Sequence, residues 1–141
     1  MNETMHAIRE PVEAWFRRIE EQRSSSAGEP RPVAEDVTVV IKTLGREILR
    51  QALRSIAVGE VLPARVVVVH QGDDERVCKW AEELSGALTV EYVADERRRA
   101  AAGINRGLER VRTRFVALTD DDCVDAVDWI ARLAERLRAE P

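Results

Sequence analysis

The chain has 141 residues, of which 45% are hydrophobic and 34% are charged. This length fits one ordinary domain with a buried core, and the composition excludes wholesale disorder. The formal net charge of -4 argues against a nucleic-acid partner, because nucleic-acid binders are normally basic. The two cysteines form no CxxC pair, which excludes a zinc ribbon or a disulfide framework. No apolar run approaches the ~20 residues of a membrane span and no signal peptide is recognised, so we expect a cytoplasmic protein.

The first predicted element is an amphipathic helix within residues 1–22, with Pro11 at its first helical position. Its apolar residues share one stripe at helical spacing: Val12, Trp15, Phe16 and Ile19. Residues 23–36 are rich in Ser, Pro and Gly, which is typical of a linker. We therefore expect a helix that docks on the following domain or on a partner. The helix suggests two interactions: a homo-oligomer formed through it, or attachment to the cytoplasmic face of the membrane.

From residue 37 onward, apolar strand-like runs alternate with helical stripes. The predicted strands are residues 37–41, 65–69, 88–93 and 115–118. The predicted helices are residues 48–56, 77–84, 101–111 and a last one with Asp125 as its N-cap. This order predicts an α/β fold with a mostly parallel sheet and helices on both faces, in Rossmann-like alternation. Ligands of such sheets bind beyond the carboxyl ends of the strands.

Three adjacent aspartates follow the fourth predicted strand: Asp120, Asp121 and Asp122. Side chains alternate in an extended segment, so Asp120 and Asp122 should point to one side and Asp121 to the other. Two carboxylates on one side suit Mg²⁺ or Mn²⁺, with water and substrate phosphates completing the coordination. We therefore expect a metal site here. The alternative is a solvated acidic loop with one aspartate capping a helix.

The loops after the first two strands also carry polar residues. Residues 42–46 run into a helix, whose free N–H groups attract an anion. They contain neither a dinucleotide fingerprint nor a Walker A motif. After the second strand, His70 is either a catalytic group or a hydrogen-bonding residue at a strand end. Asp73 and Asp74 are expected to cap the next helix.

Five motifs occur in a set order from the first strand onward. They are VVIKTLGR at 39–46, HQGDD at 70–74, GINRGL at 103–108, FVALTDDDC at 115–123 and the dipeptide at 128–129. Together they resemble the nucleotide-sugar-binding half of a family 2 glycosyltransferase with the GT-A fold, over about residues 37 to 137. The resemblance implies metal-dependent, inverting transfer of a sugar from a nucleotide-diphosphate sugar to a glycan, lipid or small-molecule acceptor. It also implies that residues 37–141 lack the acceptor-binding half, with the general base beyond Pro141 and no activity of this chain alone.

The resemblance assigns roles to single residues. Thr43 would lie beside the nucleobase, and Asp121 or Asp120 would meet the ribose. Asp122 would hold the metal, with Asp120 beside it. The remaining residues that the resemblance places near the nucleotide are Arg46, His70, Arg99 and Asn105. The sequence departs from the family pattern at four of the aligned positions: Lys42 for Pro, Gly45 for Asn, His70 for Asp and Ile104 for Arg.

Two other functions are compatible with the sequence. Residues 120–124 also fit the DxDx[TV] motif of haloacid-dehalogenase-like phosphatases, with Asp120 as nucleophile and Asp122 as acid/base. However, that motif normally follows the first strand of its domain, and three strands precede it here. The third possibility is a non-catalytic binding or assembly module that keeps the sheet.

Gly103 and Gly107 lie four residues apart in one predicted helix, where each costs ~1 kcal/mol relative to alanine. We interpret them as points of close approach to a strand or to the nucleotide. The alternative is a helix that breaks near Gly103.

Overall fold

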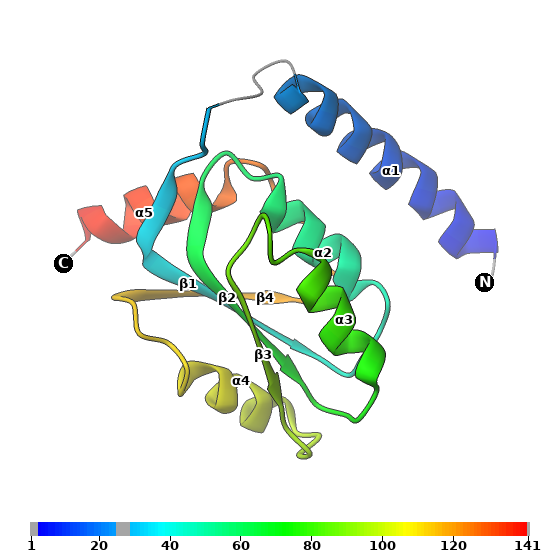
Figure 1. The fold of residues 1–141 in the computed structure, drawn as a ribbon, viewed down its shortest axis with the longest axis vertical. Helices are drawn as coiled ribbons and strands as arrows, with labels where there is room; N and C mark the ends of the chain where they lie inside the picture. Colours follow the sequence, from blue (N-terminus) through cyan, green and yellow to red (C-terminus); the bar gives the residue numbers. More distant parts are fainter. Residues whose placement is uncertain (1–2, 25–28, 141) are drawn as a thin grey trace. The chain divides into compact units, whose positions relative to one another are not determined.

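The computed structural model describes residues 3–24 and 29–140 and divides the chain into two units, residues 1–30 and 31–141 (Figure 1). The N-terminal unit contains helix α1 (Glu3–Ser24). Pro11 lies inside this helix, so the prediction that it stands at the first helical position is wrong. Proline prefers the first turn of a helix, but that preference does not prevent the helix from beginning further upstream. The rings of Trp15 and Phe16 pack edge to face, with centroids 5.0 Å apart. Among the described residues, no helix combines the length and the apolar character that crossing a membrane requires.

The second unit is the predicted α/β domain. Its strands are β1 (Val33–Thr43), β2 (Leu62–His70), β3 (Val90–Ala94) and β4 (Phe115–Asp120). Its helices are α2 (Leu49–Ala57), α3 (Glu75–Glu83), α4 (Ala100–Leu108) and α5 (Trp129–Ala139). The strands form one parallel sheet in the order β3-β2-β1-β4. The fold predicted from the alternating pattern is therefore confirmed.

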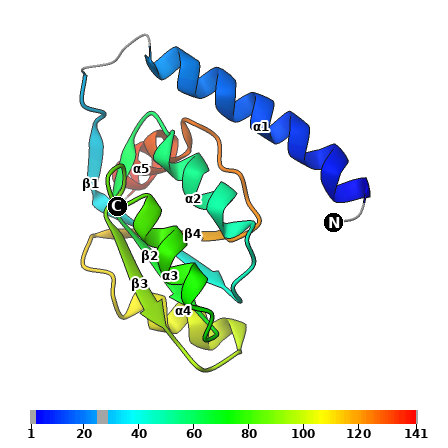
Figure 2. The same cartoon turned by 45° about the vertical axis from the view of Figure 1, so that its right-hand side comes forward.

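Both faces of this sheet are covered, as a parallel sheet requires. On one face, side chains of β1 and β2 such as Val39 and Val66 form the main core with α2, α3 and α5. On the other face, α4 packs over β1 and β2, where Val40, Val67 and Val69 are buried. In Figure 1 the strands run between α4 and the helices α2 and α3, and Figure 2 shows the same ribbon turned by 45°.

The first strand begins earlier than predicted, so the predicted linker is shorter. Val33 and Ala34 pair with Leu62 and Pro63 before the register shifts toward Thr38. This pairing is non-local, which explains why β propensity alone missed it. Of the predicted linker, residues 25–28 lie outside the described residues.

The last helix begins at Trp129, so the prediction of Asp125 as its N-cap is wrong. The backbone N–H of Asp125 donates to Ser55 Oγ at 3.0 Å, and its carboxylate accepts a 3.2 Å hydrogen bond from Thr119. Asp125 therefore anchors the loop before α5 to the end of β4 and to α2. Burial raises the pKa of its carboxyl, and the Thr119 hydrogen bond opposes that shift.

The close approach predicted for the glycines of α4 is confirmed. A Cβ at Gly107 would overlap Cγ1 of Val40, and a Cβ at Gly103 would lie 2.7 Å from the side-chain amide of Gln71. The helix is continuous from Ala100 to Leu108, so it does not break at Gly103. Both glycines let α4 lie directly on the sheet.

Candidate functional site

Four loops meet at one edge of the sheet, because the carboxyl ends of parallel strands lie side by side. They follow Thr43, His70, Ala94 and Asp120, the last residues of the four strands. Apart from Asn105, which lies in the middle of α4, the polar residues singled out in the sequence end these strands or lie on these loops. The edge therefore gathers the candidate site.

Asp121 ties the loop after β4 to the loop after β1. Its carboxylate is buried and accepts a 2.8 Å hydrogen bond from the hydroxyl of Thr43. The guanidinium of Arg46 pairs with both oxygens of the same carboxylate, and this contact raises the pKa of Arg46. Gly45 donates its backbone N–H to Thr43 Oγ1 at 3.0 Å and has a φ of 96°. Glycine suits that conformation, and asparagine, which the family pattern has here, also tolerates it.

Asp120 and Asp122 are exposed, whereas Asp121 is buried. The segment is not extended as predicted: residues 121–122 form a turn, in which the backbone N–H of Cys123 donates to the Asp120 carbonyl at 3.3 Å. Asp122 therefore lies near the same Arg46 guanidinium as Asp121, while Asp120 pairs with Lys42. Three possible ligand atoms lie within 4.8 Å of one another: one carboxylate oxygen of Asp120, one of Asp122, and Sγ of Cys123. The two carboxylates are exposed, and each has a long ion pair: Lys42 Nζ lies 3.7 Å from Asp120 and Arg46 lies 3.8 Å from Asp122. Such exposed pairs contribute little free energy, so a divalent cation can displace them.

The donor atoms suit a hard divalent cation. Carboxylate oxygens are preferred by Mg²⁺ and Mn²⁺, whereas the sulfur of Cys123 is a softer ligand. Sequence reasoning did not single out Cys123 or Lys42 as neighbours of this pair. The signal for Lys42 is its register, because it pairs with Asp120 across β1 and β4.

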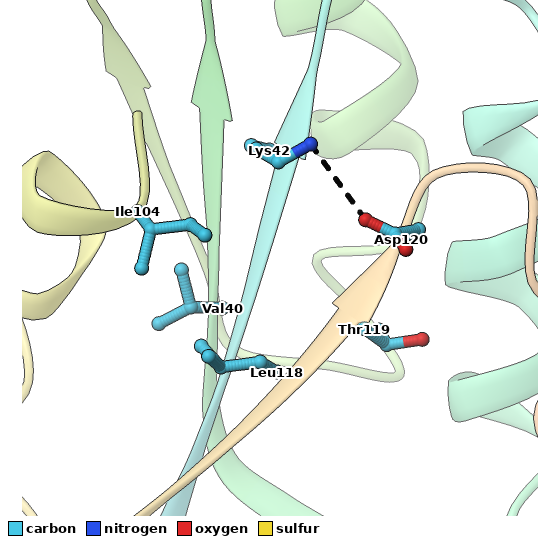
Figure 3. A pocket seen from close by; sticks show the side chains of 6 residues that line it. All are labelled: Val40, Lys42, Ile104, Leu118, Thr119 and Asp120. Carbon is cyan, nitrogen blue, oxygen red and sulfur yellow. Dashed lines mark ion pairs between the residues drawn. The ribbon is translucent and has the colours of Figure 1, made fainter. Parts of the chain in front are cut away.

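A pocket of about 230 Å³ lies beside Asp120, between α4 and strands β1 and β4. Its lining residues are Val40, Lys42, Ile104, Leu118, Thr119 and Asp120. Figure 3 shows Lys42 reaching toward Asp120 at one end of the pocket, while Ile104 of α4 faces Val40 and Leu118. The pocket therefore has apolar walls and a charged rim that includes one of the candidate metal ligands.

His70 lies beneath the surface of this edge. Its side chain is fully buried, and Nδ1 is 2.7 Å from the Tyr92 hydroxyl. Nε2 has no hydrogen-bond partner in the part of the chain that the structure describes. A Cβ at Gly45 or Gly72 would lie 3.2 or 2.9 Å from Nε2, so two loop backbones close over the ring. Burial lowers the pKa of His70, and Asp74 and Asp73 partly oppose this effect.

The other residues that the sequence singled out differ in how close they lie to this edge of the sheet. Arg46 spans the carboxylates of Asp121 and Asp122. Arg99 is exposed at the N-cap position of α4 and so lies at the same edge of the sheet. Asn105 is exposed midway between the two sheet-facing glycines, and at 100° per residue its side chain projects away from the sheet. Asp74 caps α3, accepting from the Arg76 backbone N–H at 3.0 Å, and the Arg76 side chain lowers the pKa of Asp74 to about 2.

Comparison with known proteins identifies the fold and the family. Residues 38–141 match the family model described as glycosyl transferase family 2. Among solved structures, the crystal structure of S. aureus TarS matches with a TM-score of 0.56 and 18% sequence identity, covering 73% of this chain. The chain spans only 20% of the length of that TarS chain, and at this identity the likeness shows the fold alone. No curated protein matches the sequence. Because the family model covers well over half of the chain, the protein belongs to glycosyl transferase family 2.

Proposed function

We propose that this chain binds the nucleotide-diphosphate part of a sugar donor at the carboxyl edge of its sheet and supports inverting transfer of that sugar to a glycan, lipid or small-molecule acceptor. The observation that carries this proposal is the separation of the three aspartates. Asp121 is buried against Thr43 and Arg46, while Asp120 and Asp122 remain exposed side by side. A solvated acidic loop would not need a buried, hydrogen-bonded middle carboxylate.

A divalent cation, Mg²⁺ or Mn²⁺, fits the exposed pair. Asp122 would hold it, with Asp120 as the second carboxylate and Cys123 close by. Such a cation stabilises the negative charge that accumulates on a departing diphosphate. Once released from its long ion pair, Lys42 would attract the same diphosphate oxygens. The exposed part of the Arg46 guanidinium would do so while Arg46 stays bonded to Asp121.

The other residues have proposed roles that follow from their burial. Thr43 and Asp121 are buried, so we assign them to the shape of the nucleotide-binding loops and not to direct contact with the base or the ribose. His70 supports the same loops from below. Arg99 is exposed at the edge and is assigned to the phosphates. The pocket beside Asp120 offers room for the sugar next to the diphosphate.

In the proposed reaction, the bond between the anomeric carbon and the diphosphate oxygen breaks, and its electron pair leaves with the diphosphate. The sugar gains oxocarbenium-like character, as in glycoside hydrolysis. The acceptor oxygen bonds to the opposite face of that carbon and gives its proton to a general base. The edge described above stabilises the leaving group, which is the donor side of this chemistry.

A thermal-shift panel tests donor binding. The purified chain is heated with UDP, GDP, CDP, ADP or dTDP, each with MnCl₂ or with EDTA. At least one diphosphate should raise the unfolding temperature with Mn²⁺ and much less with EDTA, because ligand binding stabilises the folded state. Nucleoside monophosphates serve as the control. The absence of any metal-dependent shift would contradict the proposal and favour a non-catalytic module.

A further inference from the structure

Gln71 is a buried polar residue to which sequence reasoning gave no role. It follows β2 directly and is only 3% exposed. Its side-chain Nε2 donates to the backbone carbonyls of Arg97 and Arg99 at 2.8 and 2.7 Å. Its backbone N–H donates to the Thr43 carbonyl at 2.8 Å. One residue thus joins the end of β1 to the segment between β3 and α4.

Space for this amide is provided by α4. A Cβ at Gly103 would lie 2.7 Å from both Cδ and Nε2 of Gln71. Only glycine at this position leaves the Gln71 amide where it reaches both carbonyls. The close approach of Gly103 to the sheet therefore serves the hydrogen bonds of Gln71.

A second buried side chain shapes the same segment. The Asp95 carboxylate accepts hydrogen bonds from the backbone N–H and the guanidinium of Arg97, at 3.0 to 3.1 Å. This contact lowers the pKa of Asp95. The Asp95 backbone N–H also donates to the His70 carbonyl at 2.9 Å. Residues 95–99 are therefore held from both ends.

The arginines near this segment fall into two groups. Arg97 pairs with Asp95, and Arg106 pairs with Glu109 at 2.8 Å. Arg98 and Arg99 are exposed, and within residues 3–24 and 29–140 the structure gives their side chains no hydrogen bond or ion pair. Two adjacent cations held on a fixed backbone favour an anion with several oxygens, since guanidinium groups pair well with phosphate.

The position of this pair relative to the aspartates matters. Strand β1 separates β2 from β4 in the sheet, so the end of β2 lies two strand spacings, roughly 10 Å, from the end of β4. Between them, Lys42 extends from β1 and pairs with Asp120. Arg98 and Arg99 therefore lie on one side of Lys42 along this edge of the sheet, and the carboxylates of Asp120 and Asp122 lie on the other.

We propose that Gln71 is a positioning residue for donor binding: through the carbonyls of Arg97 and Arg99 it sets the backbone from which Arg98 and Arg99 contact the diphosphate of the donor. This inference rests on the proposed function. Gln71 itself touches no ligand. It fixes the backbone of residues 97–99 before the donor binds, so that less conformational entropy is lost on binding.

The test measures the affinity of the chain for inorganic pyrophosphate with MgCl₂, and for UDP with MnCl₂, by titration calorimetry. Gln71→Met keeps the length of the side chain and removes its donors. We expect it to weaken binding about tenfold, which corresponds to ~1.4 kcal/mol. The double variant Arg98→Ala/Arg99→Ala should lose at least as much. Arg112→Ala is the matched control, because within the described part of the chain its guanidinium donates hydrogen bonds to the carbonyls of Glu109 and Val111, beyond the other end of α4.

The decisive readout is non-additivity. In the Arg98→Ala/Arg99→Ala background, Gln71→Met should cause no further loss, whereas a general loss of structure would weaken binding in both backgrounds. If Gln71→Met does not fold, Gly103→Ala replaces it, because its Cβ displaces the same amide. Unchanged affinity, or additive losses, would overturn the positioning role while leaving the proposed function intact. A wild-type chain that binds neither pyrophosphate nor any of the five nucleoside diphosphates of the thermal-shift panel would instead refute the proposed function, and this inference with it.

Discussion

The hydroxyl of Thr43 donates a 2.8 Å hydrogen bond to the buried carboxylate of Asp121, across 78 residues of sequence. This bond joins the ends of β1 and β4. The positive charge of Arg46 neutralises the same carboxylate. The two neighbours of Asp121 in the sequence, Asp120 and Asp122, stay exposed. The loop that carries the exposed pair is thus held by a contact between buried protein groups.

Thr43→Val should destabilise the fold by roughly 1–3 kcal/mol, because it removes a hydrogen bond to a buried charged group. The measurement is the midpoint of urea unfolding. Thr89→Val is the matched control, since Thr89 is exposed and its side chain makes no hydrogen bond within the described residues. Equal midpoints for the two variants would contradict the importance of the Thr43–Asp121 bond.

Gly107→Leu should destabilise the chain by ~1–3 kcal/mol, because the new side chain overlaps Val40 on β1. Gly86→Leu provides the control, since no atom lies within 4 Å of a Cβ built at Gly86. Denaturant unfolding of both variants checks this. A Gly107→Leu midpoint that matches the wild type would show that α4 does not pack closely on the sheet.

The stability of the chain should fall as the pH drops below about 6.5, the ordinary pKa of histidine. Burial lowers the pKa of His70 in the folded state, so the unfolded state binds a proton first and is favoured on acidification. This loss begins near the unfolded pKa and levels off below the folded one. His70→Gln should flatten the curve of unfolding free energy between pH 7 and pH 5. Parallel curves for the two proteins would show that His70 does not cause the dependence.

Strands β1, β2 and β4 were predictable because their continuous apolar runs, such as Val66 to Val69, are typical of a sheet covered on both faces. The starts of β1 and α5 were not predictable. They depend on contacts between distant residues, namely the pairing of Val33 with Leu62 and the hydrogen bond from Asp125 to Ser55. Local propensity carries no information about either contact.

The candidate site was predictable in part for the same reason. The position of the three aspartates at the carboxyl end of a strand follows from the alternating pattern of strands and helices. The burial of Asp121 between two exposed neighbours depends instead on its contacts with Thr43 and Arg46, which lie on a distant loop. The burial of His70 beneath Gly45 and Gly72 depends on how two loops close, and the contacts of Gln71 depend on the segment after β3. A single glutamine after a strand gives no signal of such a role.

Metal-dependent binding of a nucleoside diphosphate at Asp122 is measured by calorimetric titration of the wild-type chain and Asp122→Ala with UDP and the other nucleoside diphosphates, with MnCl₂ or with EDTA. The control is Asp36→Ala, which removes a carboxylate near the start of β1, at the opposite edge of the sheet. We predict that Mn²⁺ strengthens binding of at least one diphosphate to the wild type and to Asp36→Ala, and that Asp122→Ala loses this metal dependence. Equal metal-dependent affinity in the wild type and Asp122→Ala would show that Asp122 does not hold the cation.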